Sequence, residues 1–198
     1  MSWFLRLRGV HWSLISAALV IGWSVLVPSL AFTFPTLFAS GQLGSTRIAN
    51  VISLVPELLW LWGIARSRGP GERTGSTRRG LWAIDLTTPV LSIALATVLL
   101  ALTPTVDLES VWRNFCLFFA LAMIAHLVLP QTYAFILPTG YLLLSMLVGF
   151  RPFDPQPRSW ALVLMTAPDI SVDVVSIAAF AVGLVVYAAG TLWRSLTR

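Results

Sequence analysis

The chain alternates long apolar runs with short polar breaks, and the apolar runs have the length that membrane-crossing helices need. Uncharged residues fill Gly9–Thr46, Leu86–Val106, Asn114–Phe150 and Val174–Trp193. A helix needs about 20 apolar residues to cross the roughly 30 Å hydrocarbon core of a bilayer. The pattern therefore predicts an all-α, polytopic membrane protein, with residues 1–198 forming a single transmembrane domain.

Two of these runs are too long for one crossing. Asn114–Phe150 would form a helix of roughly 55 Å, so it must fold back. Pro130 and Pro138 mark the turn, because proline disfavours the helix before it. Gly9–Thr46 holds one span and then Phe32–Thr46, which we expect to be a loosely structured aromatic connection at the membrane surface. The prediction is six spans, near residues 11–31, 48–65, 86–103, 111–129, 132–149 and 174–193.

The cationic residues predict the orientation of this bundle. All thirteen are arginines, and short cytoplasmic loops of membrane proteins carry an excess of such residues. With six spans, nine arginines lie on the same side of the membrane as the two chain termini. The four on the opposite side are Arg47, Arg113, Arg151 and Arg158. We therefore expect cytoplasmic termini and a multi-pass protein of a cell membrane, of the bacterial inner or plasma membrane type. A signal peptide is the rival interpretation of the first span, but its apolar core is usually only about 7–15 residues long.

Composition narrows the possible functions. With 57% hydrophobic and 11% charged residues, a soluble domain is excluded. The net charge of +5 suits anionic headgroups, and we expect no nucleic-acid partner. The absence of lysine excludes a Walker A loop and Schiff-base chemistry. Cys116, His11 and His126 form no metal-binding motif with the acids, so we expect no enzyme activity, no metal and no cofactor bound by this chain.

One polar stripe lies inside a predicted span. Asn50, Ser53 and Glu57 stand at i, i+3 and i+7, on one face of the second span. Such a face is excluded from lipid, because an ionisable group at membrane depth costs about 2.5–3.5 kcal/mol on insertion scales. Two interpretations follow: a substrate or proton pathway, or a neutral glutamic acid whose hydrogen bonds hold the bundle together.

Further polar and small residues have structural interpretations. Asp85, Thr88 and Ser92 form a second stripe at the start of the third span, where we expect Asp85 to cap the helix N-terminus. Ala179 and Gly183 in the last span form a small-x-x-x-small pair, which permits close helix packing.

Two connections carry most of the functional inference. The first is Arg66–Asp85, a basic loop that ends in an apolar patch and contains Trp82; its part from Thr77 is long enough for one or two helical turns. The second is Phe150–Ser171, whose apolar piece includes Trp160, Leu162 and Leu164. That piece is too short to cross, so we expect it to be interfacial or re-entrant before the last span.

The whole arrangement resembles the ABC-2-type exporter permeases, six-span subunits that work with separate ATPase chains. In that family an amphipathic segment precedes the first span, as Ser2–Gly9 does here. A cytoplasmic coupling element follows the second span, and short re-entrant helices precede the last, as in Arg66–Asp85 and Trp160–Met165. The resemblance implies that these residues couple to the ATPase: Arg6, Arg8, Arg66, Arg68, Arg73, Arg78, Arg79 and Trp82.

The resemblance further implies a homodimer, or a pair with a second permease, in which partner ATPase subunits bind ATP and Mg²⁺. The cargo would be amphipathic: a peptide antibiotic, a lipid-like molecule or a drug. The path would run near Asn50, Ser53 and Glu57. The residues also leave other functions open. One is the substrate-binding membrane subunit of an importer or a small secondary carrier that uses Glu57. Another is a non-transporting assembly or immunity protein.

Overall fold

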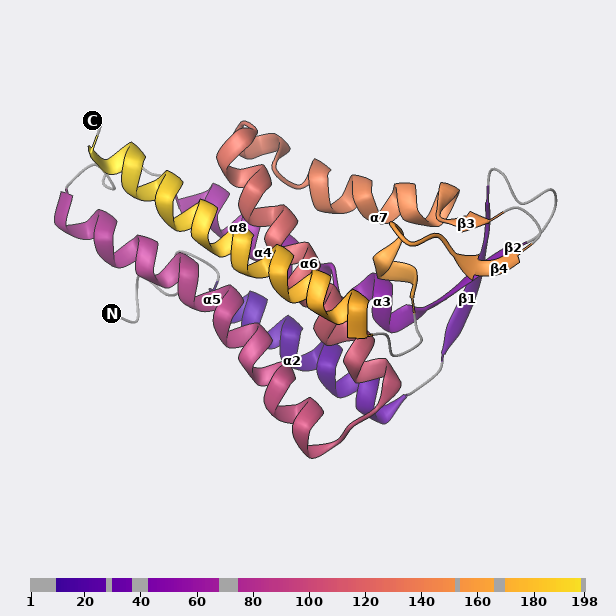
Figure 1. Ribbon diagram of the computed structural model, residues 1–198. Coiled ribbons are helices and arrows are strands. Elements are labelled where there is room, and N and C mark those ends of the chain that lie inside the picture. The colour runs from indigo at the N-terminus through magenta and orange to yellow at the C-terminus, as the bar shows by residue number, and fades with distance from the viewer. Residues whose placement is uncertain are drawn as a thin grey trace.

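The computed structural model describes residues 10–27, 30–36, 43–67, 75–151, 154–165 and 170–196, and most of them are helical (Figure 1). The helices are α2 (Val10–Leu26), α3 (Ile48–Ile52), α4 (Val55–Ser67), α5 (Gly75–Leu102), α6 (Val106–Val128), α7 (Ile136–Val148) and α8 (Ile170–Leu196). Two single 3₁₀ turns are η2 (Gln131–Tyr133) and η3 (Leu162–Leu164).

Within the described residues, five helical segments are long and apolar enough to cross a membrane. They are Ile48–Arg66, Asp85–Leu102, Leu108–Val128, Gln131–Val148 and Ile170–Trp193. They agree within a few residues with the predicted second to sixth spans. The turn between α6 and α7 lies at Pro130, as predicted, whereas Pro138 lies in the first turn of α7. The first predicted span is represented by α2, which is apolar but has only 17 residues.

The prediction that helix extends to residue 31 was wrong. The chain is mostly helical, as predicted, but it also contains short strands. Helix α2 stops at Leu26, two residues before Pro28, whose ring disfavours helix in the preceding residue. Strand β1 (Ala31–Pro35) then pairs antiparallel with β2 (Leu43–Arg47). The segment expected to be a loose connection therefore contains an ordered strand pair.

A second small strand pair lies beside the first at the same end of the molecule (Figure 1). It consists of β3 (Phe150–Arg151) and β4 (Asp154–Pro157), which also run antiparallel. The rings of Phe34 and Phe150, one from each pair, lie 5.9 Å apart. Aromatic residues favour strands and pack across them, and this contact joins the two pairs into one cap.

Helix α6 is the central helix of the bundle. It contacts α2, α3, α4, α5, α7, α8 and η3. Its side chains Phe115, Phe118 and Phe119 are fully buried. Helix α8 approaches α6 at Gly183, where a Cβ atom would lie only 2.9 Å from the Cα of Ala120. Gly183 of the small-residue pair in the last span is therefore used for packing within the chain.

The outer faces of the helices are apolar. Leu19 on α2 is 68% exposed, and Val185 on α8 is 65% exposed. Exposed apolar surface of this extent marks a membrane or protein contact, and here it covers helices of membrane-crossing length. The start of α5 and the end of α8 lie at the end of the molecule opposite the strand cap (Figure 1).

Candidate functional site

The second membrane segment is not a single helix. Helix α3 ends at Ile52, a turn occupies Ser53 and Leu54, and α4 begins at Val55. Pro56 has no N–H, so it cannot donate to the carbonyl of Ile52 as a helical residue would. The sequence contains the signal for this break in Pro56, but the prediction had treated residues 48–65 as one span.

The predicted polar stripe flanks this break. Asn50, Ser53 and Glu57 are fully buried, each with 0% exposure. The Ser53 hydroxyl donates to the carbonyl of Asn50 at 2.7 Å, and the Asn50 amide nitrogen donates to the Thr46 hydroxyl at 3.4 Å. The stripe thus lies inside the bundle, away from lipid. Its part in a substrate pathway stays a prediction.

The carboxyl group of Glu57 is the least satisfied polar group at the break. Within the described part of the chain, neither of its oxygens has a hydrogen-bond partner, and the side-chain oxygen of Asn50 has none either. An ionised carboxylate buried in this way would be strongly unfavourable, because no side chain among the described residues replaces its lost hydration. The carboxyl group of Glu57 can accept a proton, or it can pair with a cationic group that enters the bundle.

Pro56 and Trp60, which flank Glu57 on α4, contact three other helices. On α2, the Ser13 hydroxyl donates to the carbonyl of Pro56 at 2.8 Å. On α4 itself, the Trp60 indole N–H donates to the backbone carbonyl of Asp85 at 3.0 Å, which ties α4 to α5. The Trp60 ring also packs edge-on against Phe119 of α6. The first turns of α4, which hold Glu57, are therefore bound to α2, α5 and α6.

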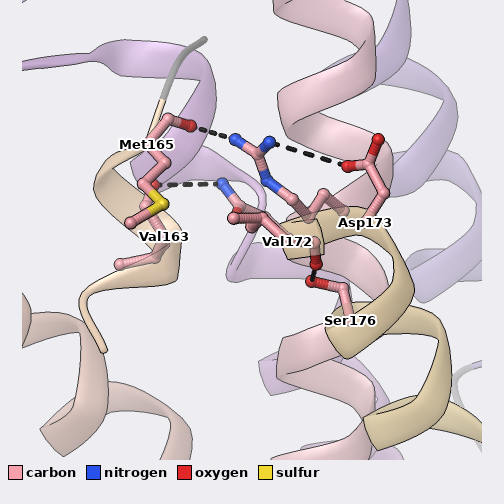
Figure 2. A network of polar contacts seen from close by, with 7 residues as sticks. Val163, Met165, Val172, Asp173 and Ser176 are labelled. Carbon is pink, nitrogen blue, oxygen red and sulfur yellow. Dashed lines mark hydrogen bonds and ion pairs between the residues drawn. The ribbon is translucent and has the colours of Figure 1, made fainter. Parts of the chain in front are cut away.

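A second buried polar cluster centres on Arg113 of α6, whose side chain is 1% exposed (Figure 2). Its guanidinium donates to the carbonyl of Met165, and it lies 3.6 Å from the carboxylate of Asp173 on α8. The Asn114 amide nitrogen donates to the carbonyl of Val163 at 3.5 Å. Helix α6 thereby binds both the segment before α8 and the first turn of α8.

Tyr141 of α7 binds the same segment from the other side. Its hydroxyl donates to the carbonyl of Trp160 at 2.8 Å and accepts from the N–H of Leu162 at 3.1 Å. We name Trp160–Met165 the clasped segment, because side chains of α6 and α7 bind its backbone. Non-helical backbone at membrane depth requires such partners or a water-lined cavity.

The clasped segment contains the residues predicted to be re-entrant. Leu164 is buried and Trp160 is 38% exposed, while Leu162 is half-buried. Helical structure is limited to the single turn η3. Arg113, by contrast, had been treated only as an orienting charge. Its position inside the predicted span 111–129 was a signal that it needs a buried partner.

The residues expected to couple to an ATPase are only partly described. Arg66 lies in the last turn of α4, is exposed, and its guanidinium lies 5.1 Å from the ring centroid of Trp62. The backbone of α5 carries Arg78, Arg79 and Trp82, whose side chains are outside the described part. Four more arginines also lie outside the described residues: Arg6, Arg8, Arg68 and Arg73.

Helix α5 also corrects the role expected of Asp85. The helix begins at Gly75 and continues without interruption to Leu102, so Asp85 lies inside it and cannot be its N-terminal cap. The segment before the third span is thus a continuous helical extension, longer than the one or two turns expected from Thr77. Thr88 and Ser92 of the second stripe are buried, and the Ser92 hydroxyl donates to the Thr88 carbonyl at 3.0 Å.

No group of three or more His, Cys, Asp or Glu side chains is placed to bind a metal ion among the residues that the structure describes. No family model matches the chain, and no curated protein or solved structure matches it either. The functional proposal therefore depends on the geometry of the broken helix, the clasped segment and the extended helix α5.

Proposed function

We propose that this chain is the membrane-spanning permease subunit of an ATP-driven exporter of an amphipathic substrate, such as a peptide antibiotic, a lipid-like molecule or a drug. The observation that carries the proposal is the clasped segment. Its polar backbone atoms are bound by three side chains of two other helices. A few such contacts can break together, so the segment can move as a unit beside α6 and α7.

Helix α5 supplies the second support. Its 28 residues give a length of about 42 Å, whereas the hydrocarbon core is about 30 Å thick. The turns that carry Arg78 and Arg79 therefore extend beyond the core. A push at this end of α5 would pass along the helix, which stays helical through Pro89, to the helices around α6, as coupling to an ATPase requires.

In this proposal α2 also crosses the membrane, which brings the number of crossings to six, and both termini are cytoplasmic. Its 17 residues rise about 26 Å, at the short end of the range for membrane helices. The extended end of α5 then lies in the cytoplasm, and the strand cap lies outside the cell membrane. The permease pairs with a second copy or a second permease. Partner ATPase subunits bind ATP and Mg²⁺.

One observation favours a second candidate, a secondary carrier or importer subunit that uses Glu57. A static bundle gains nothing from a buried carboxyl group without a partner, since such groups cost stability. Broken helices near the membrane centre form the ion and substrate sites of many carriers. In this candidate the break between α3 and α4 would bind the coupled proton or the cationic substrate.

Purification of the tagged chain in mild detergent, with mass spectrometry of the bound proteins, separates the two candidates. The exporter proposal expects an ATPase at a ratio near one to one. Neutralising Arg78 and Arg79 together with glutamine should release it, because these residues lie on the extension of α5. The same change at Arg151 and Arg158, near the strand cap, is the matched control and should leave the ATPase bound.

A preparation that holds no ATPase in detergent and again in lipid nanodiscs would overturn the exporter proposal. Solute or proton movement by that same preparation, reconstituted alone in vesicles, would then establish the carrier. Loss of this movement in Glu57→Gln would assign it to the broken helix.

A further inference from the structure

Three ionisable side chains lie together near the start of α6, where this helix meets the first turn of α8. Glu109 lies four residues before Arg113 on α6, so the two share one face of the helix. Arg113 lies 3.6 Å from the carboxylate of Asp173 on α8 (Figure 2). The carboxyl group of Glu109 also forms a hydrogen bond with the Asp173 side chain. Two acids from two helices therefore adjoin one arginine.

This arrangement requires a proton. Two ionised carboxylates contain only hydrogen-bond acceptors, so they repel and cannot hydrogen-bond to each other. The single positive charge of Arg113 balances only one of them. The hydrogen bond between Glu109 and Asp173 therefore exists only while one of the two acids is protonated.

The surroundings of the two acids differ. Asp173 lies in the first turn of α8, where the helix dipole favours a carboxylate, and it also faces the guanidinium of Arg113. Glu109 is half-buried, and its own N–H already donates to the carbonyl of Thr105 at 3.0 Å. Of the two acids, Glu109 is therefore the one that carries the proton, and its O–H donates to the Asp173 carboxylate.

The pair is open to solvent, and its electrostatic surroundings are simple. The side chain of Asp173 is 23% exposed, so a proton can reach the pair from water. Among the described residues, the charges that act most strongly on Glu109 are those of Asp173 and Arg113. Two other segments that contact this part of α6, the clasped segment and residues 93–102 of α5, contain no ionisable side chain.

We propose that Glu109 and Asp173 form a proton-binding site that controls the contact of α6 with α8 and with the clasped segment. With the proton bound, the pair joins α6 to α8, and Arg113 binds both Asp173 and the carbonyl of Met165. When Glu109 releases its proton to water, its carboxylate repels that of Asp173 and competes for Arg113 from one helical turn away. The contact of Arg113 with Met165 then weakens, so a rise in pH loosens the clasped segment.

The test is the thermal stability of the whole purified chain in detergent, measured from about pH 5 to about pH 8. The folded state holds a proton that it loses as the pH rises, so the unfolding midpoint of the wild type should fall across this range. In Glu109→Gln an amide N–H replaces the carboxyl O–H and keeps the bond to Asp173 at every pH. The midpoint of this variant should therefore fall less. Other titrating groups are common to both proteins, so the difference between the two profiles belongs to Glu109.

Hydrogen exchange locates the effect. The exchange rates at residues 160–165, each divided by its intrinsic rate at the same pH, should increase by about tenfold between the two ends of the range, as for the loss of one charge-assisted hydrogen bond. They should stay constant in Glu109→Gln. Glu57→Gln, which removes a buried carboxyl group of α4, is the matched control and should keep the pH dependence of the wild type.

Infrared difference spectra detect the proton itself, because a protonated carboxyl group absorbs apart from a carboxylate. In the Glu57→Gln protein, such a band should disappear as the pH rises, and Glu109→Gln added to it should remove this part of the spectrum. If Glu109→Gln does not fold, Asp173→Asn serves in its place. It removes the acceptor from α8 and should lower the midpoint while it flattens the profile.

Three results would overturn the proposal. The first is the same pH profile of stability in the wild type and in Glu109→Gln. The second is exchange at residues 160–165 that does not change with pH in the wild type. The third is a protonated-carboxyl band that Glu109→Gln leaves unchanged. None of them bears on the transport proposal, because the proton site needs only the contacts of α6 with α8 and the clasped segment.

Discussion

The break around Glu57 and the cluster around Arg113 both bury ionisable side chains among membrane helices, but in opposite ways. Arg113 meets a carbonyl and a carboxylate from two different elements. Glu57 has no hydrogen-bond partner among the described residues for either carboxyl oxygen. A side chain that makes such contacts holds separate segments together, even where a neighbouring atom such as Asp173 Oδ1 has no hydrogen bond. A side chain whose partners are missing keeps binding capacity for a group that enters and leaves.

The largest effect should follow from breaking the cluster. Arg113→Met keeps much of the side chain's length, but it removes the donor to the carbonyl of Met165 and the cation beside the carboxylate of Asp173. Removing one member of a fully buried ion pair costs about 3–5 kcal/mol, and because Asp173 is 23% exposed, we expect a loss toward the lower end of that range. Cys116, one turn away on α6 and 1% exposed, is the built-in reporter. We expect a thiol-reactive dye to label it at a much lower temperature than in the wild type.

The matched control for Arg113→Met is Arg151→Met, which removes an exposed arginine of β3. It should leave the labelling temperature of Cys116 within a few degrees of the wild type. Equal labelling temperatures for the wild type and Arg113→Met would show that the ion pair does not hold α6, α8 and the clasped segment together.

The next effect concerns the packing that brings Asp173 to Arg113. A Cβ atom at Gly183 would lie 2.9 Å from the Cα of Ala120, so Gly183→Ala must separate α6 from α8. Overpacking of this kind costs about 1–3 kcal/mol. Gly140→Ala on α7 is the control, since nothing lies within 4 Å of its Cβ position. Thermal unfolding should show a lower midpoint for the first variant and not for the second.

A smaller effect should follow from Tyr141→Phe, which loosens the clasped segment without removing a charge. It removes the hydroxyl that binds Trp160 and Leu162, at a net cost of about 1–2 kcal/mol. The local readout is hydrogen exchange, which should accelerate at the amides of residues 160–165. Exchange that matches the wild type at these amides would contradict the role assigned to Tyr141.

These polar contacts also show which features the sequence could predict. The helices of the second to sixth predicted spans depend on local apolar composition, which one chain segment carries by itself. The pair of Arg113 and Asp173 joins residues 60 positions apart, and no periodicity reveals such a partner. The contact of Phe34 with Phe150 likewise depends on which segments, far apart in the sequence, lie side by side in the fold. Each strand is five residues or fewer, too short for a clear alternating pattern.

The break near Glu57 could be predicted only in part. The polar stripe and Pro56 can both be read from the sequence, but the missing hydrogen bonds of Glu57 cannot. Polar residues at i, i+3 and i+7, as at Asn50, Ser53 and Glu57, are predicted to share one face of a helix. Only the surrounding helices decide whether a side chain on that face finds a donor. Here α2 directs the Ser13 hydroxyl to the carbonyl of Pro56 and not to the Glu57 carboxyl group.

The smallest effect on stability, and the sharpest test of the comparison, should come from Glu57→Gln. Glutamine has nearly the same shape and cannot ionise, and it removes no hydrogen bond described in the structure, so the free energy of unfolding should change by much less than in Arg113→Met. A hydrophobic carbodiimide, which reacts with carboxyl groups in apolar surroundings, should label the wild type at the peptide that contains Glu57 and should not label that peptide in the variant. Destabilisation as large as that of Arg113→Met would instead show that Glu57 is a bonded structural residue. The contrast between Arg113, which pairs with other segments, and Glu57, which does not, would then be lost. The support for the carrier would be lost with it.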